Sequence, residues 1–242
     1  MMYLNERIDD LQRGGLRVIQ RADAFRFGTD AVLLADFAAP RRHDRVCDLG
    51  TGTGIIPLLL YARENTISAD AVEIQPDMAD MAARSMAMNG LNEKIRVLPG
   101  DLRSIRTLLP HARYDLVTCN PPYGKAGGTL LNPDASKRLA RHEESCAIED
   151  VACAAAWLLQ NGGRLCCVFP AARMIELSDA MRKYRMAPKR IRMVHSRVEK
   201  AAHLCLMGGM LDARPGLIIE PPLVIYDENN AYTPELRRIY GL

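Results

Sequence analysis

Four consecutive residues, Asn120 to Tyr123 (NPPY), follow an apolar run from Tyr114 to Val117. The apolar run is typical of a buried strand, and two adjacent prolines cannot continue its ladder because neither has a backbone N–H. The side-chain carbonyl of Asn120 and the backbone carbonyl of Pro121 can each accept a hydrogen bond from a planar amino group. An aromatic ring at Tyr123 can stack on a nucleic-acid base.

These groups suit an attack by an amino nitrogen on an electrophile. The lone pair of an exocyclic amino group is delocalised into its ring, so the nitrogen is a poor nucleophile until its N–H groups are held by acceptors. Two carbonyls of fixed direction can bias that nitrogen towards a tetrahedral geometry without a metal ion or a base of shifted pKa. The structural alternative is a strand that simply ends at prolines.

A second candidate site is the glycine-rich stretch from Asp48 to Gly54 (DLGTGTG), which follows the short apolar strand expected over 45–50. Glycines let a ligand approach the backbone, and the helix expected next would present free N–H groups. A dinucleotide fingerprint reads G-x-G-x-x-G, whereas this stretch reads G-x-G-x-G. The spacing therefore favours a nucleoside without a pyrophosphate, and an ordinary structural turn is the alternative.

Acidic residues end the next two expected strands. Glu73 lies 19 residues after Gly54, where a carboxylate can accept hydrogen bonds from both hydroxyls of a ribose. Asp101 follows Gly100 and is well placed for an adenine amino group. Each acid alone could be an ordinary exposed residue, but the fit of three consecutive strand ends favours a nucleoside site.

The positions of these residues depend on an alternation of strand-like and helix-like segments. Such alternation predicts an α/β fold with a mostly parallel sheet, helices on both faces and a ligand crevice at the carboxyl ends of the strands. Strands are expected at 45–50, 69–74, 94–101, 114–120, 163–170, 189–196, 203–210 and 221–226, and helices at 55–63, 76–90, 148–160 and 172–185. We expect one domain with an N-terminal cap or lid (1–44), a Rossmann-like core (45–226) and a C-terminal tail (227–242).

Composition narrows the class of protein. The longest apolar run has nine residues, Val151 to Leu159, which is less than half of the roughly 20 that a membrane-spanning helix needs. With no signal-like N-terminus, a cytoplasmic location is expected. Seven cysteines include no C-x-x-C pair, which favours reduced, buried thiols over zinc ligands or disulfides, and no metal is expected.

Basic residues are unevenly distributed. The net charge of +3 does not imply nucleic-acid binding, but nine Lys and Arg stand against three acids between Arg173 and Lys200. Such a stretch attracts phosphate groups, and Lys189, Arg190 and Arg192 are candidate contacts with RNA. A solvated helix surface is the alternative.

The motifs DLGTGTG, VEI, GD and NPPY, in this order and spacing, resemble the S-adenosyl-L-methionine-dependent methyltransferases of the Rossmann-like class I, and NPPY marks the subset that methylates planar nitrogens. The resemblance implies a seven-stranded sheet whose last strand is antiparallel. It implies cofactor contacts at Asp48, Gly50, Gly52, Gly54, Glu73, Ile74, Asp101, Leu102 and Asn120, and catalytic contacts at Asn120, Pro121, Pro122 and Tyr123.

Four longer stretches, 25–38, 120–143, 182–196 and 221–241, resemble the tRNA1(Val) (adenine(37)-N6)-methyltransferase family. This resemblance implies N6 methylation of the adenosine just 3′ of the anticodon. Other substrates that NPPY enzymes use stay open: an amino group of ribosomal RNA or DNA, or a protein glutamine. A non-catalytic cofactor-binding subunit is the alternative outside enzymes.

Two segments flank the expected site. The glycine-rich, polar stretch between Tyr123 and Glu149 suggests a mobile substrate loop, whose possible RNA contacts are Lys125, Arg138, Arg141 and His142. The segment before the apolar helix that begins at Ala31 can act as a lid, with Arg26 or Thr29 near the methionine carboxylate of the cofactor. Alternatively, Thr29 or Asp30 is simply the N-cap of that helix.

Overall fold

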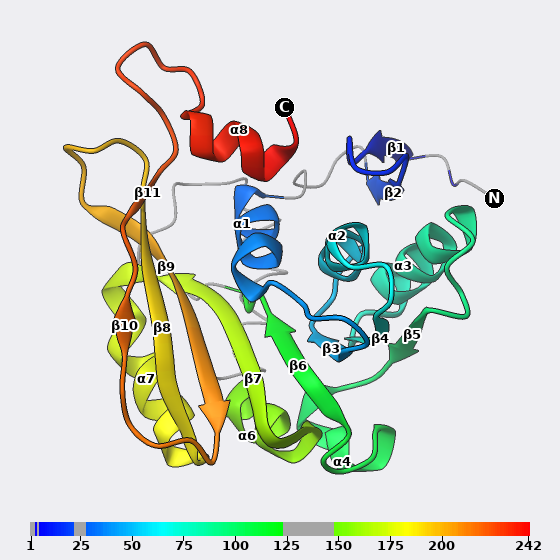
Figure 1. The fold of residues 1–242 in the computed structure, drawn as a ribbon. Coiled ribbons are helices and arrows are strands. Elements are labelled where there is room, and N and C mark those ends of the chain that lie inside the picture. Colours follow the sequence, from blue (N-terminus) through cyan, green and yellow to red (C-terminus); the bar gives the residue numbers. More distant parts are fainter. Residues whose placement is uncertain (1–2, 4, 22–27, 123–147) are drawn as a thin grey trace.

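The computed structural model describes residue 3 and residues 5–21, 28–122 and 148–242. Its centre is one large sheet whose strands cross the molecule side by side (Figure 1). The strands are β3 (Arg45–Leu49), β4 (Ser68–Glu73), β5 (Ile95–Pro99), β6 (Tyr114–Cys119), β7 (Leu159–Pro170), β8 (Met186–His195), β9 (Ala202–Leu211), β10 (Ile218–Ile219) and β11 (Leu223–Val224).

The strand order is β10-β8-β9-β7-β6-β3-β4-β5, and β11 also pairs with β8. Strands β3 to β7 are parallel to one another, while β9 is antiparallel to both β7 and β8. The seven strands from β3 to β9 thus form a mostly parallel sheet whose last strand is antiparallel, and the predicted α/β, Rossmann-like fold is confirmed. The two-residue strands β10 and β11 extend its edge.

Helices cover both faces of the sheet (Figure 1). One layer contains α1 (Thr29–Ala38), α2 (Ile55–Arg63) and α3 (Pro76–Met88); the other contains α4 (Ile105–Leu108), α6 (Ile148–Leu158) and α7 (Met174–Lys183). Successive side chains of a strand point to opposite faces of the sheet and so contribute to both cores. In β7, Cys166 and Val168 belong to the first core, and Leu165, Cys167 and Phe169 belong to the second. No helix among these described segments is long and apolar enough to cross a membrane.

The thiols are consistent with this packing. Cys47, Cys119, Cys166, Cys167 and Cys205 are buried free cysteines, and Cys153 is half-buried. Burial raises the pKa of Cys166 to about 11, so that thiol stays protonated at neutral pH. Cys146 lies outside the described residues.

The structure departs from the sequence-based expectation at both ends. An antiparallel hairpin of β1 (Glu6–Asp10) and β2 (Arg17–Arg21) precedes the core and contacts α3, where the backbone N–H of Ile19 donates to Ser85 Oγ at 3.0 Å. The strand expected at 221–226 is reduced to β11, because Pro221 and Pro222 cannot donate to the ladder.

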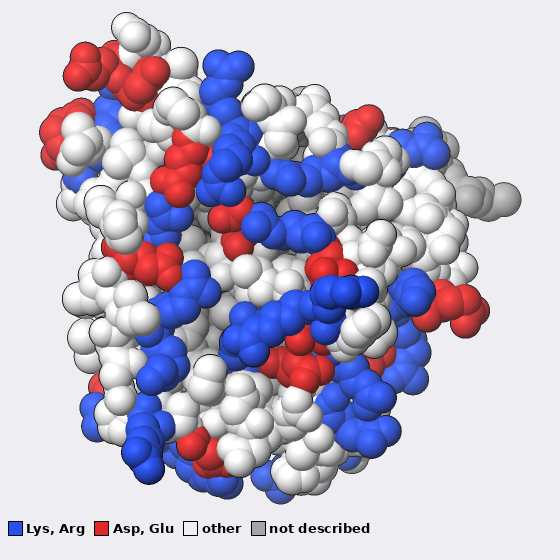
Figure 2. All heavy atoms as spheres, in the orientation of Figure 1, with Lys and Arg blue, Asp and Glu red and all other residues white. Residues whose placement is uncertain are grey.

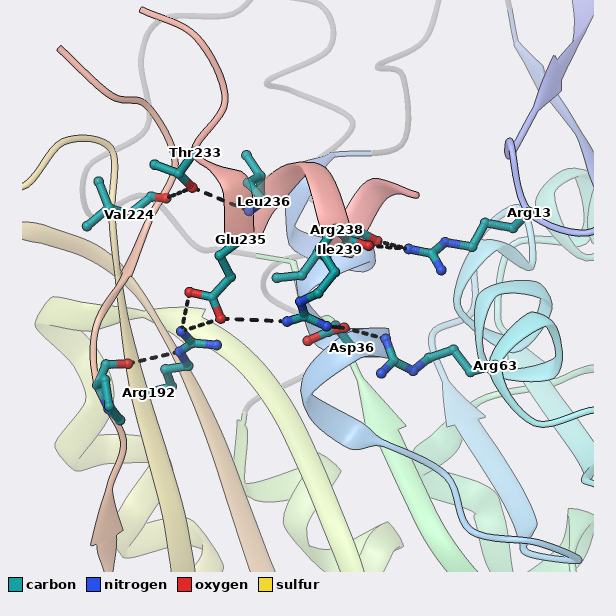
Figure 3. A network of polar contacts seen from close by, with 11 residues as sticks. Arg13, Asp36, Arg63, Arg192, Val224, Thr233, Glu235, Leu236, Arg238 and Ile239 are labelled. Atoms are coloured by element: carbon teal, nitrogen blue, oxygen red, sulfur yellow. Dashed lines mark hydrogen bonds and ion pairs between the residues drawn. The ribbon is translucent and has the colours of Figure 1, made fainter. Parts of the chain in front are cut away.

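The expected C-terminal tail contains a helix, α8 (Pro234–Tyr240), that packs against α1 (Figures 1 and 3). The backbone N–H of Leu236 donates to the Thr233 side chain at 3.3 Å, which caps the first turn. Leu236 and Ile239 are buried in the core of the α1 layer. The stacked rings of Tyr226, Tyr232 and Tyr240 add further contact within this segment, with ring centroids 5.5 Å apart at each step. The C-terminal segment therefore belongs to the helical layer that carries α1.

Candidate functional site

The carboxyl ends of three adjacent strands form the candidate site. Leu49 of β3 pairs with Val72 of β4 on one side and with Cys119 of β6 on the other. The residues that follow these three, namely Gly50, Glu73 and Asn120, therefore lie in one row at the edge of the sheet. Residues separated by up to 70 positions in sequence are brought together, as the strand-end argument predicts.

Asp48 lies beneath this row and is completely buried. The hydroxyl of Thr118 donates to its Oδ1 at 2.6 Å, whereas Oδ2 is buried with no hydrogen-bond partner in the described part of the chain. Burial raises the pKa of Asp48 to about 7 and the charge of Glu73 adds to the shift, although the hydroxyls of Thr118 and Thr51 oppose it. A buried carboxylate oxygen without a partner is costly, so a polar group of a bound ligand would be stabilising here.

The glycines after Asp48 have two different roles. At Gly50, where φ is +71°, an added Cβ would meet nothing within 4 Å, so its open side faces free space. At Gly54 an added Cβ would collide with the side chain of Met86 and approach Ala82 at 3.3 Å. Gly50 therefore lines space that a ligand can enter, while Gly54 allows close packing of the loop on α3.

Most backbone N–H groups of the glycine-rich loop already have acceptors. Those of Gly50 and Thr51 donate to the carbonyl of Val72 at 2.9 and 3.0 Å, and that of Gly52 donates to Glu73 Oε2 at 2.8 Å. The loop is thus fixed against the end of β4. It offers a ligand its open glycine surface.

Glu73 is only 4% exposed and is held by backbone donors. Besides the Gly52 contact, Oε1 accepts a hydrogen bond from the backbone N–H of Gln75 at 2.9 Å. A carboxylate oxygen can accept more than one hydrogen bond, so each oxygen of Glu73 can still accept one from a ribose hydroxyl. The next residue, Ile74, is 44% exposed and offers an apolar side chain beside the carboxylate.

Asp101 lies after the neighbouring strand, β5. The backbone N–H of Gly100 donates to the carbonyl of Glu73 at 2.9 Å, which keeps the two acids at the same sheet edge. Asp101 caps a short 3-10 helix that starts at Leu102, and its carboxylate pairs with Arg103 at 2.5 Å. The hydrogen bonds from Arg103 lower the pKa of Asp101, so an amino group at this position would share a charged acceptor with Arg103.

The NPPY motif is described as far as Pro122. Asn120 is half-buried, Pro121 is buried and Pro122 is exposed, which fits a chain leaving the sheet at this point. Several predicted site residues lie outside the described residues and stay predictions. They are Tyr123, Lys125, Arg138, Arg141, His142 and Arg26.

The start of α1 differs from the capping expectation. Gly28 is the N-cap, with no side-chain hydrogen bond, and Thr29 is the first helical residue, so the expectation of Thr29 or Asp30 as N-cap is wrong. The hydroxyl of Thr29 is left available for other contacts and accepts a hydrogen bond from the Tyr240 hydroxyl at 3.1 Å.

The three basic candidates on β8 already have intramolecular partners. Arg190 pairs with Glu220 at 2.5 Å, and Arg192 donates from Nη2 to both carboxylate oxygens of Glu235 at 2.8 Å. Lys189 Nζ reaches the carbonyl of Arg214 at 3.3 Å. Arg190 and Arg192 thus fasten the C-terminal segment to β8, and their assignment to RNA stays a prediction.

Sequence reasoning missed Thr118, which fixes the buried Asp48. A threonine inside an otherwise apolar strand was the available signal, since a buried hydroxyl needs a partner. Together, the open glycine surface, the unpartnered Asp48 oxygen and the positioned Glu73 carboxylate fit a nucleoside cofactor with a polar methionine end. In the regions that the structure describes, no cluster of three or more metal-ligating side chains occurs.

Comparison with known proteins agrees with this reading. Residues 22–190 match the family described as the methyltransferase small domain. The tRNA1(Val) (adenine(37)-N6)-methyltransferase of Tolumonas auensis is 34% identical over 216 residues, which are 88% of this chain and 86% of that protein. The protein of the same name from Porphyromonas gingivalis is 31% identical over 231 residues, 91% of this chain and 89% of the relative.

A solved structure supports the fold. The crystal structure of a predicted O-methyltransferase, Atu636 from Agrobacterium tumefaciens, superposes with a TM-score of 0.72 and 24% sequence identity. The match covers 88% of this chain and 95% of that one. At this identity the likeness concerns the arrangement of strands and helices alone.

Proposed function

The chain belongs to the tRNA1(Val) (adenine(37)-N6)-methyltransferase family, and from this we propose that it transfers the methyl group of S-adenosylmethionine to N6 of an adenine in tRNA. The observation that carries the proposal is the row of Gly50, Glu73 and Asn120 at one sheet edge. In this proposal Glu73 is the acceptor for the ribose and Asn120 an acceptor for the amino group, at the ends of the two strands that flank β3. The proposed target is adenosine 37 of tRNA1(Val), as in the names of the relatives.

Each proposed cofactor-binding residue would contact a different part of the cofactor. Glu73 would accept the ribose hydroxyls, and Ile74 with Leu102 would pack against the adenine ring, whose amino group would reach Asp101. Gly50 and Gly52 would leave room for the ligand, and Asp48 would serve the polar methionine end. The bound cofactor supplies an electrophilic methyl group on a sulfonium.

Methyl transfer itself requires little from the protein beyond orientation. Asn120 and the carbonyl of Pro121 would accept the two N6 hydrogens, which directs the nitrogen lone pair along the line of attack. Held in this way, the N6 nitrogen would accept the methyl group that the cofactor supplies and would then release one proton to solvent. Pro122 keeps the carbonyl of Pro121 fixed, and Tyr123 would stack on the flipped adenine.

The RNA contacts proposed outside the described residues are Lys125, Arg138, Arg141 and His142, with Arg26 and Thr29 near the methionine carboxylate. The activity would take place in the cytoplasm, where tRNA is processed. These assignments rest on the family and the sequence.

The proposal is tested by incubating the purified protein with labelled S-adenosylmethionine and, separately, bulk tRNA, ribosomal RNA, DNA and a release factor. The modified product is then identified by nucleoside and peptide analysis. We expect label only in N6-methyladenosine of tRNA. Label in ribosomal RNA, DNA or a glutamine side chain would assign a different planar nitrogen, and no label in any substrate would favour a non-catalytic cofactor-binding subunit.

A further inference from the structure

Two arginines from distant segments pair with one carboxylate of α1, and a third arginine lies near them at the end of α8 (Figure 3). Arg13 comes from the turn of the β1–β2 hairpin, Arg63 from the end of α2 and Arg238 from α8. Arg63 forms an ion pair with Asp36 of α1, and Arg238 Nη1 lies 4.0 Å from the same carboxylate. Three positive charges therefore share one negative charge.

The acids near this group do not neutralise it. Glu235 lies 3.7 Å from Arg238, but its two oxygens already accept hydrogen bonds from Arg192. Arg13 donates to the carbonyls of Arg238 and Ile239 at the end of α8, which carry only partial charges. Burial lowers the pKa of Arg13, and the nearby Arg63 and Arg238 lower it further, a sign of mutual repulsion.

One more arginine of α8, Arg237, is exposed next to Arg238, which is 62% exposed. We call Arg13, Arg63, Arg237 and Arg238 the arginine surface. Against Asp36, their formal surplus is 4 − 1 = +3, equal to the net charge of the whole chain. In Figure 2, Lys and Arg side chains gather over the part of this face that α8 and α1 occupy in Figure 1.

Contacts of α8 extend to the start of α1. The Tyr240 hydroxyl of α8 contacts Thr29, the first residue of α1, at 3.1 Å. Asp36 follows seven residues later, which corresponds to roughly 10 Å along the helix axis at about 1.5 Å per residue. A nucleic-acid strand carries one phosphate about every 3.4 Å of its axis, so about three phosphates span this distance.

We propose that the arginine surface binds the phosphate backbone of the RNA substrate. The inference rests on the proposed function. It assigns the main electrostatic contact with RNA to α8 instead of β8. Planar guanidinium groups form paired hydrogen bonds with phosphate oxygens. On β8, by contrast, Arg190 and Arg192 are each matched by a carboxylate.

The first test is the double variant Arg237→Gln with Arg238→Gln, measured by filter binding of tRNA over a salt series. We expect tRNA binding about 5- to 20-fold weaker at 0.1 M salt, and a slope of log K against log salt that is smaller by about one for each phosphate that is no longer neutralised. The affinity for S-adenosylmethionine and the melting temperature should stay close to wild type. Arg96→Gln is the matched control, because Arg96 is 61% exposed, pairs with Asp70 and lies near the amino end of β5.

A second variant should change tRNA binding in the opposite direction. Asp36→Asn keeps the shape of the side chain but removes the charge that occupies Arg63, so tRNA binding should tighten several-fold and its salt slope should steepen. An unchanged slope in the double arginine variant, or weaker binding by Asp36→Asn, would overturn the inference.

Binding does not require methyl transfer, which separates this inference from the proposed function. If the wild type binds tRNA through these arginines but transfers no methyl group, the inference stands and the proposed function fails. If the wild type methylates N6 of tRNA while the double variant binds with an unchanged salt slope, the proposed function stands and the inference fails.

Discussion

The hydroxyl of Thr118 donates to the carboxylate of Asp48 at 2.6 Å across the paired strands β6 and β3. The bond fixes one oxygen of a fully buried acid and leaves the other without a partner among the described residues. The pair joins the two strands that end in the NPPY motif and in the glycine-rich loop. The unpartnered oxygen of Asp48 lowers the stability of the free protein, but it is held where a ligand can donate a hydrogen bond to it.

Asp48→Asn should stabilise the free protein in a pH-dependent manner. Because burial raises the folded pKa of Asp48 from 3.8 to about 7, wild-type stability falls as pH rises from about 4 to about 7 and then levels off. The amide carries no such penalty, so the variant should be more stable by up to about 4 kcal/mol at pH 8 and nearly equal near pH 4. Denaturant unfolding at both pH values measures the difference.

The same variant should bind S-adenosylmethionine at least about tenfold more weakly at pH 8, because a charged acceptor has been replaced by a neutral amide. Calorimetric titration of both proteins tests this expectation. Equal affinity together with a gain in stability would limit Asp48 to a structural role.

Alanine substitutions should separate the two kinds of glycine in the loop. Gly54→Ala places a methyl group against Met86 and should lower the melting temperature by several degrees through overpacking and strain. Gly50→Ala meets no neighbouring atom and should cost only about 1–2 kcal/mol for its positive φ, but it fills the space that faces the ligand. We therefore expect Gly50→Ala to lose much more cofactor affinity than its loss of stability explains; parallel losses in the two variants would contradict this distinction.

Glu73→Gln should weaken cofactor binding by roughly 10- to 100-fold, about 1.4–3 kcal/mol, since a charged acceptor of ribose hydroxyls is removed. The amide group would also face the backbone N–H of Gly52 or Gln75, which now donate to the carboxylate. Transfer rates at saturating cofactor should fall much less than affinity. A large loss of rate with unchanged affinity would place Glu73 in catalysis instead of binding.

Much of the fold could be predicted from the sequence, because its strands alternate with amphipathic helices. The helix at 55–63 has the predicted bounds, and the five parallel strands begin and end within about one to four residues of expectation. The β1–β2 hairpin was missed because its strands mix charged and apolar residues, although Gly14-Gly15 in its turn was a usable signal. A strand of two residues, such as β10, carries no periodicity to detect.

The site, like the fold, could be predicted only in part from the sequence. Glu73 and the glycine-rich loop could be found because strand ends meet in a parallel sheet. The partners of Arg190 and Arg192 could not be found, since Glu220 and Glu235 lie 30 and 43 residues further along the chain. Counting charges in a window does not detect acids that the fold brings to the same strand.

Arg192→Gln should mainly destabilise the protein. Arg192 links β8 to α8 through both oxygens of Glu235 and through the carbonyl of Pro221 at 3.0 Å, and its side chain is largely buried. We expect a melting temperature lower by roughly 3–8 °C, for a loss of about 1–2 kcal/mol. The slope of tRNA binding against salt should stay close to wild type. A flatter slope without loss of stability would restore Arg192 as a phosphate contact.

Asn120→Ala should reduce methyl transfer by at least about 1,000-fold, because one of the two acceptors that orient N6 is removed. Cofactor affinity should change by no more than a few-fold, since the ribose and adenine contacts remain. Single-turnover rates and calorimetric titration measure the two effects separately. Simultaneous loss of rate and affinity would mean that Asn120 chiefly holds the cofactor.

The most direct test of N6 methylation compares two transcripts of tRNA1(Val), one with adenosine and one with guanosine at position 37. Both offer a planar amino group, but only the first has an N6. With labelled S-adenosylmethionine and the wild-type protein, we predict close to one methyl group per molecule on the adenosine transcript, recovered as N6-methyladenosine, and none on the guanosine transcript. Equal labelling of the two transcripts, or a product other than N6-methyladenosine, would contradict the proposed function.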